Sequence, residues 1–252
     1  MKRAIGVTLA LLGGALPCLA AGTPHLVAVD SNRNLYEIDM ATGAKTQIGT
    51  VSANAGTCAE LALGAGGTVY LSSTGNDSVY TLDLGTGTAT LIGAYGDSAI
   101  VMHGLEWVAS TGTLYGVSSH NNGLYSIDTG TGAATLIGTS GLTSFTNIAY
   151  DSDTGTMYAT NSGTDSLYTL DLATGATTLV GPLNGPTNPN GPTYDADNGT
   201  LYLVDNSTDS FYTIDMGTGA ATLIGSTGTG NLLGLMYING PIPVELMGFE
   251  VE

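Results

Sequence analysis

Basic side chains are almost absent from this chain of 252 residues. Four lysines and arginines stand against 21 aspartates and glutamates, which gives a formal net charge of −17 at pH 7. Such a surface repels the phosphate backbone of nucleic acids and the headgroups of anionic lipids. We therefore expect no nucleic acid among its partners, and mutual repulsion between copies favours a monomer.

Long apolar segments are confined to the N-terminus. Lys2 and Arg3 precede an apolar run over residues 4–16, and small residues follow Pro17, a pattern that predicts a signal peptide over residues 1–20. The run is shorter than the about 20 apolar residues that cross a bilayer, and no later segment reaches that length. We expect an exported protein, secreted, periplasmic or at the cell surface, without membrane insertion.

Cysteine occurs only at Cys18 and Cys58. Cys18 lies inside the predicted signal peptide, and Pro17 before it departs from the pattern of a lipidation site, so a lipid anchor is the less favoured alternative. Cys58 alone would remain after processing, which excludes an intrachain disulfide. We expect Cys58 to be a small buried residue on an inner strand rather than a nucleophile.

Helical periodicity is also missing, whereas one strand-like phrase occurs five times. The phrase consists of an apolar residue, Tyr, a variable residue, Ile or Leu, and Asp, and its tyrosines recur every 43–45 residues. Such a period is typical of propeller blades and solenoid repeats. The five copies span residues 35–39, 79–83, 124–128, 167–171 and 211–215.

Each repeat contains four short strands separated by turn residues. In the fourth repeat the strands are expected near residues 147–150, 156–160, 167–170 and 176–181. An Asp-x-x-Thr-Gly turn follows the third strand, where the carboxylate can accept hydrogen bonds from backbone amides and Gly tolerates a positive φ. Recurrence in every repeat indicates a structural role for these carboxylates, which belong to Asp39, Asp83, Asp128, Asp171 and Asp215.

The two ends of the repeat region indicate how the array closes. Residues 25–29 match the second strand of a repeat, and residues 233–237 match a first strand. We predict an all-β fold, a five-bladed β-propeller of four-stranded blades over residues 24–239, closed by pairing of the C-terminal strand with the N-terminal blade. Closure removes two free sheet edges. An open β-solenoid is the alternative, but a repeat split between the termini gives it no advantage.

The repeats resemble those of secreted bacterial β-propeller proteins, whose units read approximately Leu-Tyr-x-Ile-Asp-x-x-Thr-Gly-Ala-Ala-Thr-Leu-Ile-Gly. The resemblance covers residues 26–237 and implies the fold, but no particular activity. The tail, residues 240–252, resembles a Pro-Val-Glu-Leu-x-x-Phe ending of exported bacterial proteins. We expect it to form a short strand on the outside of the propeller.

Residues that break the repeat are the candidates for a site. We expect ligand recognition on the face formed by two sets of loops, those from an outer strand to the next inner strand and those between second and third strands. We call this the loop face. Counting along the repeats places Glu60 and Glu106 at otherwise apolar positions, where perturbed pKa values are expected. The same count predicts a channel lined by small residues and without a metal, because it aligns Ala59, Gly104, Asn147, Gly191 and Gly234.

A hydrolase acting on a sugar or lactone is the catalytic alternative, with Glu60, Glu106 and His103 as its candidate residues. A glycosidase needs two carboxylates about 5–10 Å apart, and no Gly-x-Ser-x-Gly elbow or zinc-ligand spacing occurs. No cofactor is expected. Calcium bound in the turns at Asp151 and Asp195 is a minor alternative, since both lack the downstream acidic ligand of a calcium loop.

We favour a binding or surface-interaction module over an enzyme and over a purely structural extracellular repeat protein. Polar loop tips suit a carbohydrate or an extracellular protein partner. The expected ligand-binding residues are polar or aromatic and depart from the repeat or lie in its variable loops, and they are Tyr95, His103, Trp107, His120 and Asn147.

Overall fold

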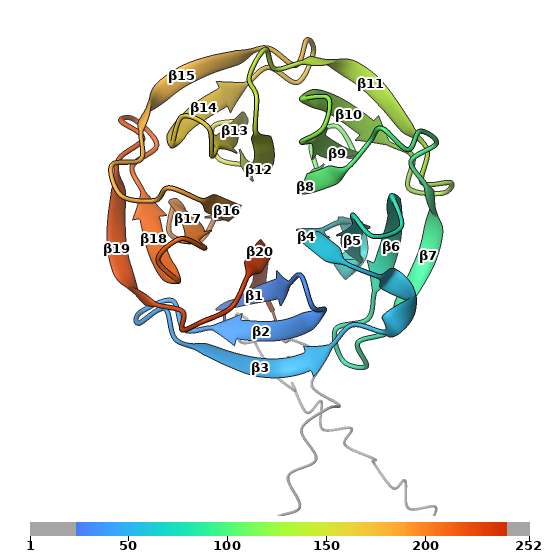
Figure 1. Ribbon diagram of the computed structural model, residues 1–252, viewed down its shortest axis with the longest axis horizontal. Coiled ribbons are helices and arrows are strands. Elements are labelled where there is room, and N and C mark those ends of the chain that lie inside the picture. The colour runs from blue at the N-terminus through green and yellow to red at the C-terminus, as the bar shows by residue number, and fades with distance from the viewer. Residues whose placement is uncertain (1–23, 241–252) are drawn as a thin grey trace, which may run out of the picture.

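The computed structural model describes residues 24–240, which form five four-stranded antiparallel sheets arranged as blades around a central axis (Figure 1). The predicted five-bladed propeller is thereby confirmed. The predicted signal peptide and nearly all of the tail lie outside the described residues. Within residues 24–240, no helix is long and apolar enough to cross a bilayer.

In each blade the strands are ordered from the innermost, nearest the axis, to the outermost. Successive blades of the ring follow one another along the chain (Figure 1). Blade 1 contains β20 (Leu232–Asn239), β1 (Pro24–Asp30), β2 (Asn34–Ile38) and β3 (Lys45–Thr50). Blade 2 contains β4 (Cys58–Leu63), β5 (Val69–Ser73), β6 (Ser78–Leu82) and β7 (Ala89–Ala94). Blade 3 contains β8 (Met102–Val108), β9 (Thr113–Ser118), β10 (Gly123–Ile127) and β11 (Ala134–Thr139).

Blades 4 and 5 repeat this pattern without interruption. Blade 4 contains β12 (Phe145–Asp151), β13 (Thr156–Asn161), β14 (Ser166–Leu170) and β15 (Thr177–Pro182). Blade 5 contains β16 (Pro189–Asp195), β17 (Thr200–Asp205), β18 (Ser210–Ile214) and β19 (Ala221–Ser226). Two single-turn 3-10 helices flank β4, namely η1 (Ala53–Ala55) and η2 (Ala65–Gly67).

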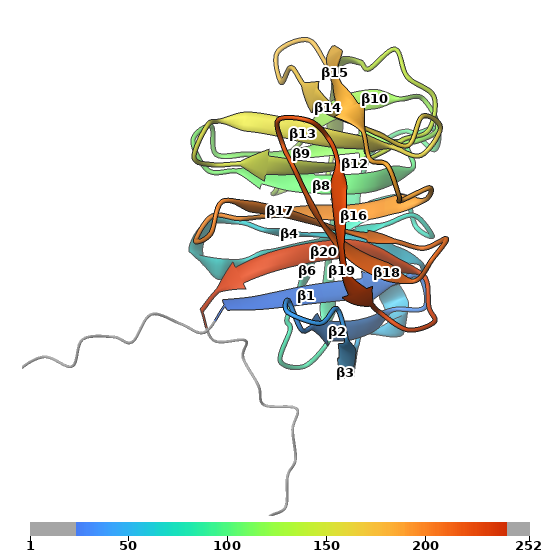
Figure 2. The ribbon, with the colours of Figure 1, turned by 90° about the vertical axis from the view of Figure 1, so that its left-hand side faces the viewer.

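Ring closure occurs in blade 1, where the last strand pairs with the first. β20 lies antiparallel to β1, with Pro24 opposite Asn239 and Leu26 opposite Tyr237. The end of β20 and the start of β1 lie on the same face of the ring (Figure 2). That face carries the turns between first and second strands and between third and fourth strands, and we call it the turn face. The loop face is opposite.

Alternation along each strand builds the core between blades. In β1, Leu26 and Ala28 pack in a cluster with side chains of blade 5, whereas Val27 and Val29 pack in a cluster with side chains of blade 2. Successive residues of a strand point to opposite faces of the sheet, so each blade contributes to two cores. Burying each of the leucine and valine side chains stabilises the fold by roughly 1.5–3 kcal/mol.

Carboxylates lock the turns as predicted. Asp39 Oδ1 accepts hydrogen bonds from the backbone N–H groups of Ala41 and Thr42 at 2.9 and 3.0 Å, and Gly43 has a φ of 76°. Asp151 Oδ1 similarly accepts from the N–H groups of residues 153 and 154 at 2.9 and 3.1 Å. The carboxylates of both kinds of turn are occupied by backbone amides.

One hairpin departs from the repeat and shifts the inner strand of blade 2 by one residue. Ala62 pairs with Tyr70, eight residues later, whereas Glu106 pairs with Tyr115, nine residues later. The turn containing η2 is therefore one residue shorter than its counterparts. The alignment of Ala59 with the inner glycines is wrong, and Glu60 occupies their position.

Candidate functional site

A small polar cavity lies on the axis of the propeller and opens towards the turn face. Its volume is about 220 Å³, and all five inner strands line it. Convergence of five strands at one point brings together residues that are far apart in sequence. The polar groups of its lining belong to Glu106, Tyr150, Ser152, Thr193, Tyr194 and Tyr237.

Glu106 ties two neighbouring blades together at this cavity. Its Oε1 accepts a hydrogen bond from the N–H of Trp107 at 3.0 Å, and its Oε2 accepts from the N–H of Tyr150 on β12 at 3.3 Å. Each inner strand is paired on one side only, so its other edge has free amides that need acceptors. Burial raises the pKa of Glu106 to about 8, against the opposing effect of these two donors. The side chain is thus mainly protonated at pH 7.

Glu60 lies deeper on the axis and is sealed from solvent. Its exposed fraction is 1%, its Oε1 accepts from the N–H of Leu61 at 3.1 Å, and its Oε2 has no hydrogen-bond partner. Burial raises the pKa of Glu60 well above its usual value, and the charge of Glu106 adds to this shift. The two carboxylates are therefore electrostatically coupled, but only Glu106 lines the cavity.

Three tyrosines form the rim of the cavity and connect blades 4, 5 and 1 to the blade that precedes each of them. Tyr194 donates its hydroxyl to Asp153 Oδ2 at 2.8 Å, and Tyr237 donates to Asp197 Oδ2 at 2.6 Å. Tyr150 Oη lies 3.3 Å from Ser110 Oγ. Burial is the largest cause that raises the pKa values of Tyr194 and Tyr237, and the hydrogen bonds to these carboxylates are the second. Both hydroxyls therefore stay protonated and act as fixed donors.

The predicted ligand-binding residues are divided between three places. His103 and His120 lie at the loop face, where His103 Nδ1 is 2.8 Å from Ser119 Oγ and burial lowers the pKa of His103. Tyr95 and Trp107 belong to the core between blades 2 and 3, with Trp107 stacked on Tyr70 at 6.1 Å between ring centroids.

Asn147 lies on the axis at the level of Glu60, and 1% of its surface is exposed. The structure therefore brings Glu60, Glu106 and Asn147 together on the axis. It separates this group from His103, which lies near the other end of β8 beside the loop face. Sequence reasoning missed the tyrosine rim, although Tyr150, Tyr194 and Tyr237 share one position of the repeat.

Cys58 is buried, as predicted, and burial raises the pKa of its thiol to about 12. Such a thiol stays protonated and is a poor nucleophile. No cluster of three or more His, Cys, Asp or Glu side chains with metal-binding geometry occurs between residues 24 and 240.

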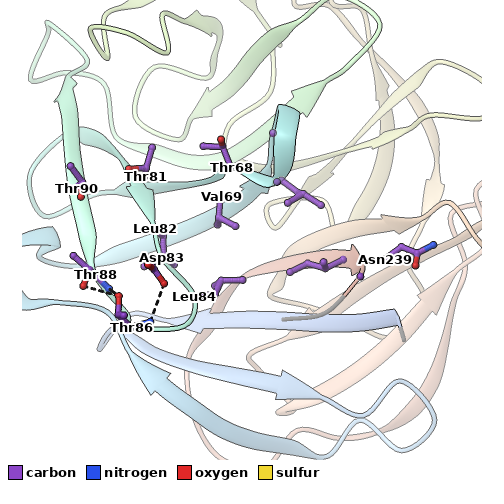
Figure 3. A pocket seen from close by; sticks show the side chains of 15 residues that line it. Thr68, Val69, Thr81, Leu82, Asp83, Leu84, Thr86, Thr88, Thr90 and Asn239 are labelled. Carbon is purple, nitrogen blue, oxygen red and sulfur yellow. Dashed lines mark hydrogen bonds between the residues drawn. The ribbon is translucent and has the colours of Figure 1, made fainter. Parts of the chain in front are cut away.

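A larger groove, of about 1020 Å³, lies on the turn face between blades 1 and 2. Apolar side chains such as Leu82 and Leu84 and a row of threonines line it (Figure 3). Its carboxylate, Asp83, accepts a hydrogen bond from the N–H of Thr86 at 3.0 Å (Figure 3). Among the described residues, Asp83 is the only ionisable side chain that lines the groove. The axial cavity, with Glu106 and three tyrosines, is therefore the better candidate for a site.

The sequence matches a family model described as a repeat of unknown function (DUF6923), over residues 10–140 and 131–230. The chain therefore belongs to this repeat family. A search of curated proteins found no significant match.

Several solved structures share the fold. A chain of a nidogen/laminin complex is 15% identical with a TM-score of 0.61, over 85% of this chain and 98% of that chain. A symmetrical protein from work on de novo evolutionary emergence is 22% identical with a TM-score of 0.57, over 88% and 100% of the two chains. Virginiamycin B lyase from Staphylococcus aureus is 15% identical with a TM-score of 0.51, over 79% of this chain and 69% of the lyase. At these identities the similarity shows the fold alone.

Proposed function

We propose that this protein is an exported binding module that takes an uncharged, hydroxyl-rich ligand, such as the terminal residue of a carbohydrate, into the axial cavity. The observation that supports the proposal is Glu106, a carboxylic acid with a pKa of about 8 in a polar cavity lined by all five inner strands. Export, to the periplasm, the cell surface or the medium, rests on the predicted signal peptide over residues 1–20.

The chemistry of the cavity favours a neutral ligand. A protonated Glu106 can both donate and accept a hydrogen bond, and the rim adds tyrosine hydroxyls. An anion would meet a chain of net charge −17 with no basic side chain in the cavity lining. The volume of about 220 Å³ is below the roughly 300–1,000 Å³ of sites for drug-sized ligands, which suits one sugar ring better than a long segment.

A glycan-array screen of the purified protein, with and without calcium, tests this proposal first. Every selective hit is then measured by titration calorimetry with Glu106→Met, and with Glu37→Met as the control, since Glu37 is a partly exposed carboxylate on β2 whose Oε1 pairs with His25. Methionine removes both hydrogen-bonding oxygens, so we expect Glu106→Met to weaken binding at least about tenfold, as for loss of one hydrogen bond to a buried polar group, and Glu37→Met to leave it unchanged.

Two outcomes contradict the axial site. A ligand lost on His120→Ala but retained by Glu106→Met binds at the loop face, where the sequence placed recognition. A blank array together with a tight protein partner removes the small-ligand proposal and favours an interaction module for an extracellular protein.

A hydrolase acting on a sugar or lactone is the second candidate, because an acid with a pKa of about 8 can serve as a general acid near neutral pH. The geometry supports it less well. Glu60 is sealed from solvent, and His103 is directed to Ser119 near the loop face. Glycosidase and lactonase substrate panels test this candidate, and turnover that Glu106→Gln leaves unchanged would exclude Glu106 as its acid.

A further inference from the structure

The groove between blades 1 and 2 lies where the ring lacks a turn. In blades 3, 4 and 5, the turn between the first and second strands contacts a tyrosine hydroxyl of the following blade, which belongs to Tyr150, Tyr194 and Tyr237 respectively. In the described part of the chain, the corresponding strands of blade 1, β20 and β1, are not joined by a turn, because they are the last and the first strand. The place that a turn fills in those three blades is therefore open beside blade 2, and Asn239 and Gly240 line the groove there.

Blade 2 has an apolar residue where the rim of the axial cavity has tyrosines. Leu63 lies opposite Val69, as Tyr150 lies opposite Met157, so it holds the position of the rim tyrosines. Its side chain has no hydroxyl to donate to a turn, and it lines the groove together with Val69. The other large apolar side chains of the lining belong to Leu82, Leu84 and Ile238.

The size and chemistry of the groove suit an extended peptide. Its volume of about 1020 Å³ exceeds the roughly 300–1,000 Å³ of sites for drug-sized ligands. The lining runs from the inner strand of blade 1 to Thr90 on β7, the outer strand of blade 2 (Figure 3). Threonine hydroxyls both donate and accept hydrogen bonds, so they can serve the backbone N–H and C=O groups of such a peptide.

The chain itself supplies a segment that starts inside the groove. Gly240 belongs to the lining, and the backbone bends there at a φ of 154°. Residues 241–252 follow directly. A four-stranded blade is about 15 Å wide at roughly 4.8 Å between strands, and six extended residues span about 20 Å. The segment is therefore long enough to cross blade 2 along the groove.

The sequence of this segment predicts one apolar side. Residues 242–246 alternate Ile, Val and Leu with Pro243 and Glu245, and residues 249–252 alternate Phe and Val with two glutamates. Successive residues of an extended segment point to opposite sides, so the apolar side chains can face the groove while the glutamates stay in water, away from Asp83. Proline lacks a backbone N–H and is tolerated in an edge strand, where no partner is needed on the outer side.

We propose that residues 241–252 dock into the groove between blades 1 and 2 as an extended segment, with Ile242 and Val244 against its apolar wall. Because the segment is tethered at Gly240, its effective concentration at the groove is on the order of millimolar, and weak contacts are sufficient. Of the residues that line the axial cavity, the groove shares only Leu63. Docking is therefore independent of the carbohydrate proposal, which rests on Glu106.

Hydrogen exchange of the processed full chain, followed by mass spectrometry, tests the docking. We expect the amides of residues 242–247 to exchange at least about tenfold more slowly than in a free peptide of residues 240–252. Val244→Asp should abolish this protection, since it places a charge against an apolar wall, whereas the neighbouring control Glu245→Gln should keep it. Exchange in blade 4 should be equal in all three proteins, which shows that the propeller stays folded. Free-peptide exchange rates in the wild type would overturn the proposal.

A spin label at Glu245→Cys locates the segment on the propeller. After removal of residues 1–20, Cys58 is the only other cysteine, and it is buried with a thiol pKa of about 12, so the label reacts at residue 245. The label should broaden the NMR signals of the Thr88 and Thr90 amides, and adding Val244→Asp should reduce the effect.

Three results of this experiment would contradict the proposal. Equal broadening with and without Val244→Asp would show that the tether alone brings the label near. Broadening confined to another part of the propeller would place the segment outside the groove. Broadening of an isotope-labelled chain by the spin label of a second copy would assign the groove to the segment of another molecule.

Discussion

Free backbone amides explain why acidic residues interrupt an apolar strand. Glu106 accepts from β8 and β12, and Thr193 Oγ1 accepts from the N–H of Tyr237 on β20 at 3.1 Å. Each of these side chains supplies acceptors that an inner strand cannot find within its own blade. The same residues that suggested chemistry in the sequence therefore also have a structural duty, and a test of function must separate the two.

Glu106 predicts a fall in stability with rising pH. Its pKa rises from an ordinary 4.5 to about 8 on folding, so between these values the native state holds a proton that the unfolded chain has lost. The free energy of unfolding then decreases as pH increases through this window, by at most about 1.4 kcal/mol per pH unit for one carboxyl. Urea unfolding at pH 5, 6.5 and 8 should show the decrease.

Glu106→Gln is the matched variant for this experiment, because its amide keeps the size of the side chain and cannot ionise. Its stability should change less between pH 5 and pH 8 than that of the wild type. Turn carboxylates such as Asp151, whose pKa is lowered, act in the opposite direction and only below about pH 4. Parallel pH profiles for the two proteins would refute the role of Glu106.

A glycine on the outer strand predicts a steric effect between blades. A Cβ at Gly138 would lie on the backbone carbonyl oxygen of Thr174 in the next blade, whereas a Cβ at Gly185 would make an ordinary contact at 3.7 Å with Tyr212. Gly138→Ala should therefore lower the free energy of unfolding by about 1–3 kcal/mol, as overpacking does. Gly185→Ala should be nearly neutral, and equal stability of the two variants would disprove the contact.

At the scale of elements, the repeated phrase was enough to predict the strands, the turns and the closure. The phrase predicts a strand because residues 35–38 alternate between the two faces of the sheet. It predicts a turn because the Asp39 carboxylate accepts a hydrogen bond from the backbone of the turn that follows it. Register was predicted less well. The short turn with η2 shifts β4, and a missing residue within a Gly-rich turn leaves no mark on the pattern of apolar residues.

The axial cavity could not be predicted from any one repeat. Its lining comes from five strands whose positions on the axis depend on ring closure. Glu106 was found because it breaks an apolar pattern. Glu60 was found by a count that the short turn displaces by one residue, since its true row holds Gly or Asn in the other blades. Tyr194 and Tyr237 were passed over because they obey the repeat, and their partners in the preceding blade's turns are about 40 residues away.

β20 predicts the effect of opening the ring. A variant that ends at Asn231 leaves β1 without its inner partner, exposing an apolar edge strand. We expect this variant to lose cooperative urea unfolding and to form oligomers that size-exclusion chromatography detects. A variant that ends at Gly240 should keep the cooperative transition of the wild type. A peptide of residues 232–239 should partly restore the fold of the open ring. An open ring with an unchanged unfolding midpoint would argue against closure as a source of stability.

At the scale of the whole molecule, the apolar side chains of the outer strands favour association between copies, and the net charge opposes it. Leu91, Leu136, Leu179 and Leu223 are each 54–59% exposed on outer strands, at the position that blade 1 gives to Gln47. Outer strands also have a free edge. Repulsion between acidic surfaces is the device that keeps such edges from pairing between molecules.

The net charge of −17 predicts stabilisation by salt, because a compact chain of one sign repels itself and ions screen the repulsion. The unfolding temperature should rise from low to moderate sodium chloride, by about 2–4 °C for each kcal/mol of repulsion relieved. Potassium chloride should act equally, in contrast to any effect specific to calcium. A melting temperature independent of salt would show that the charges are already spaced widely enough to be harmless.

One row of the inner strands gives this ring an evolutionary freedom. Ala62, Glu106, Ala149, Thr193 and Met236 hold equivalent places, each opposite the same position of its blade's second strand. The row therefore holds apolar, hydroxyl and carboxylic acid side chains in one ring of equivalent positions. A mutation in the row alters one wall of the axial space while the remaining copies preserve the ring, so new specificities can arise by drift in a single repeat.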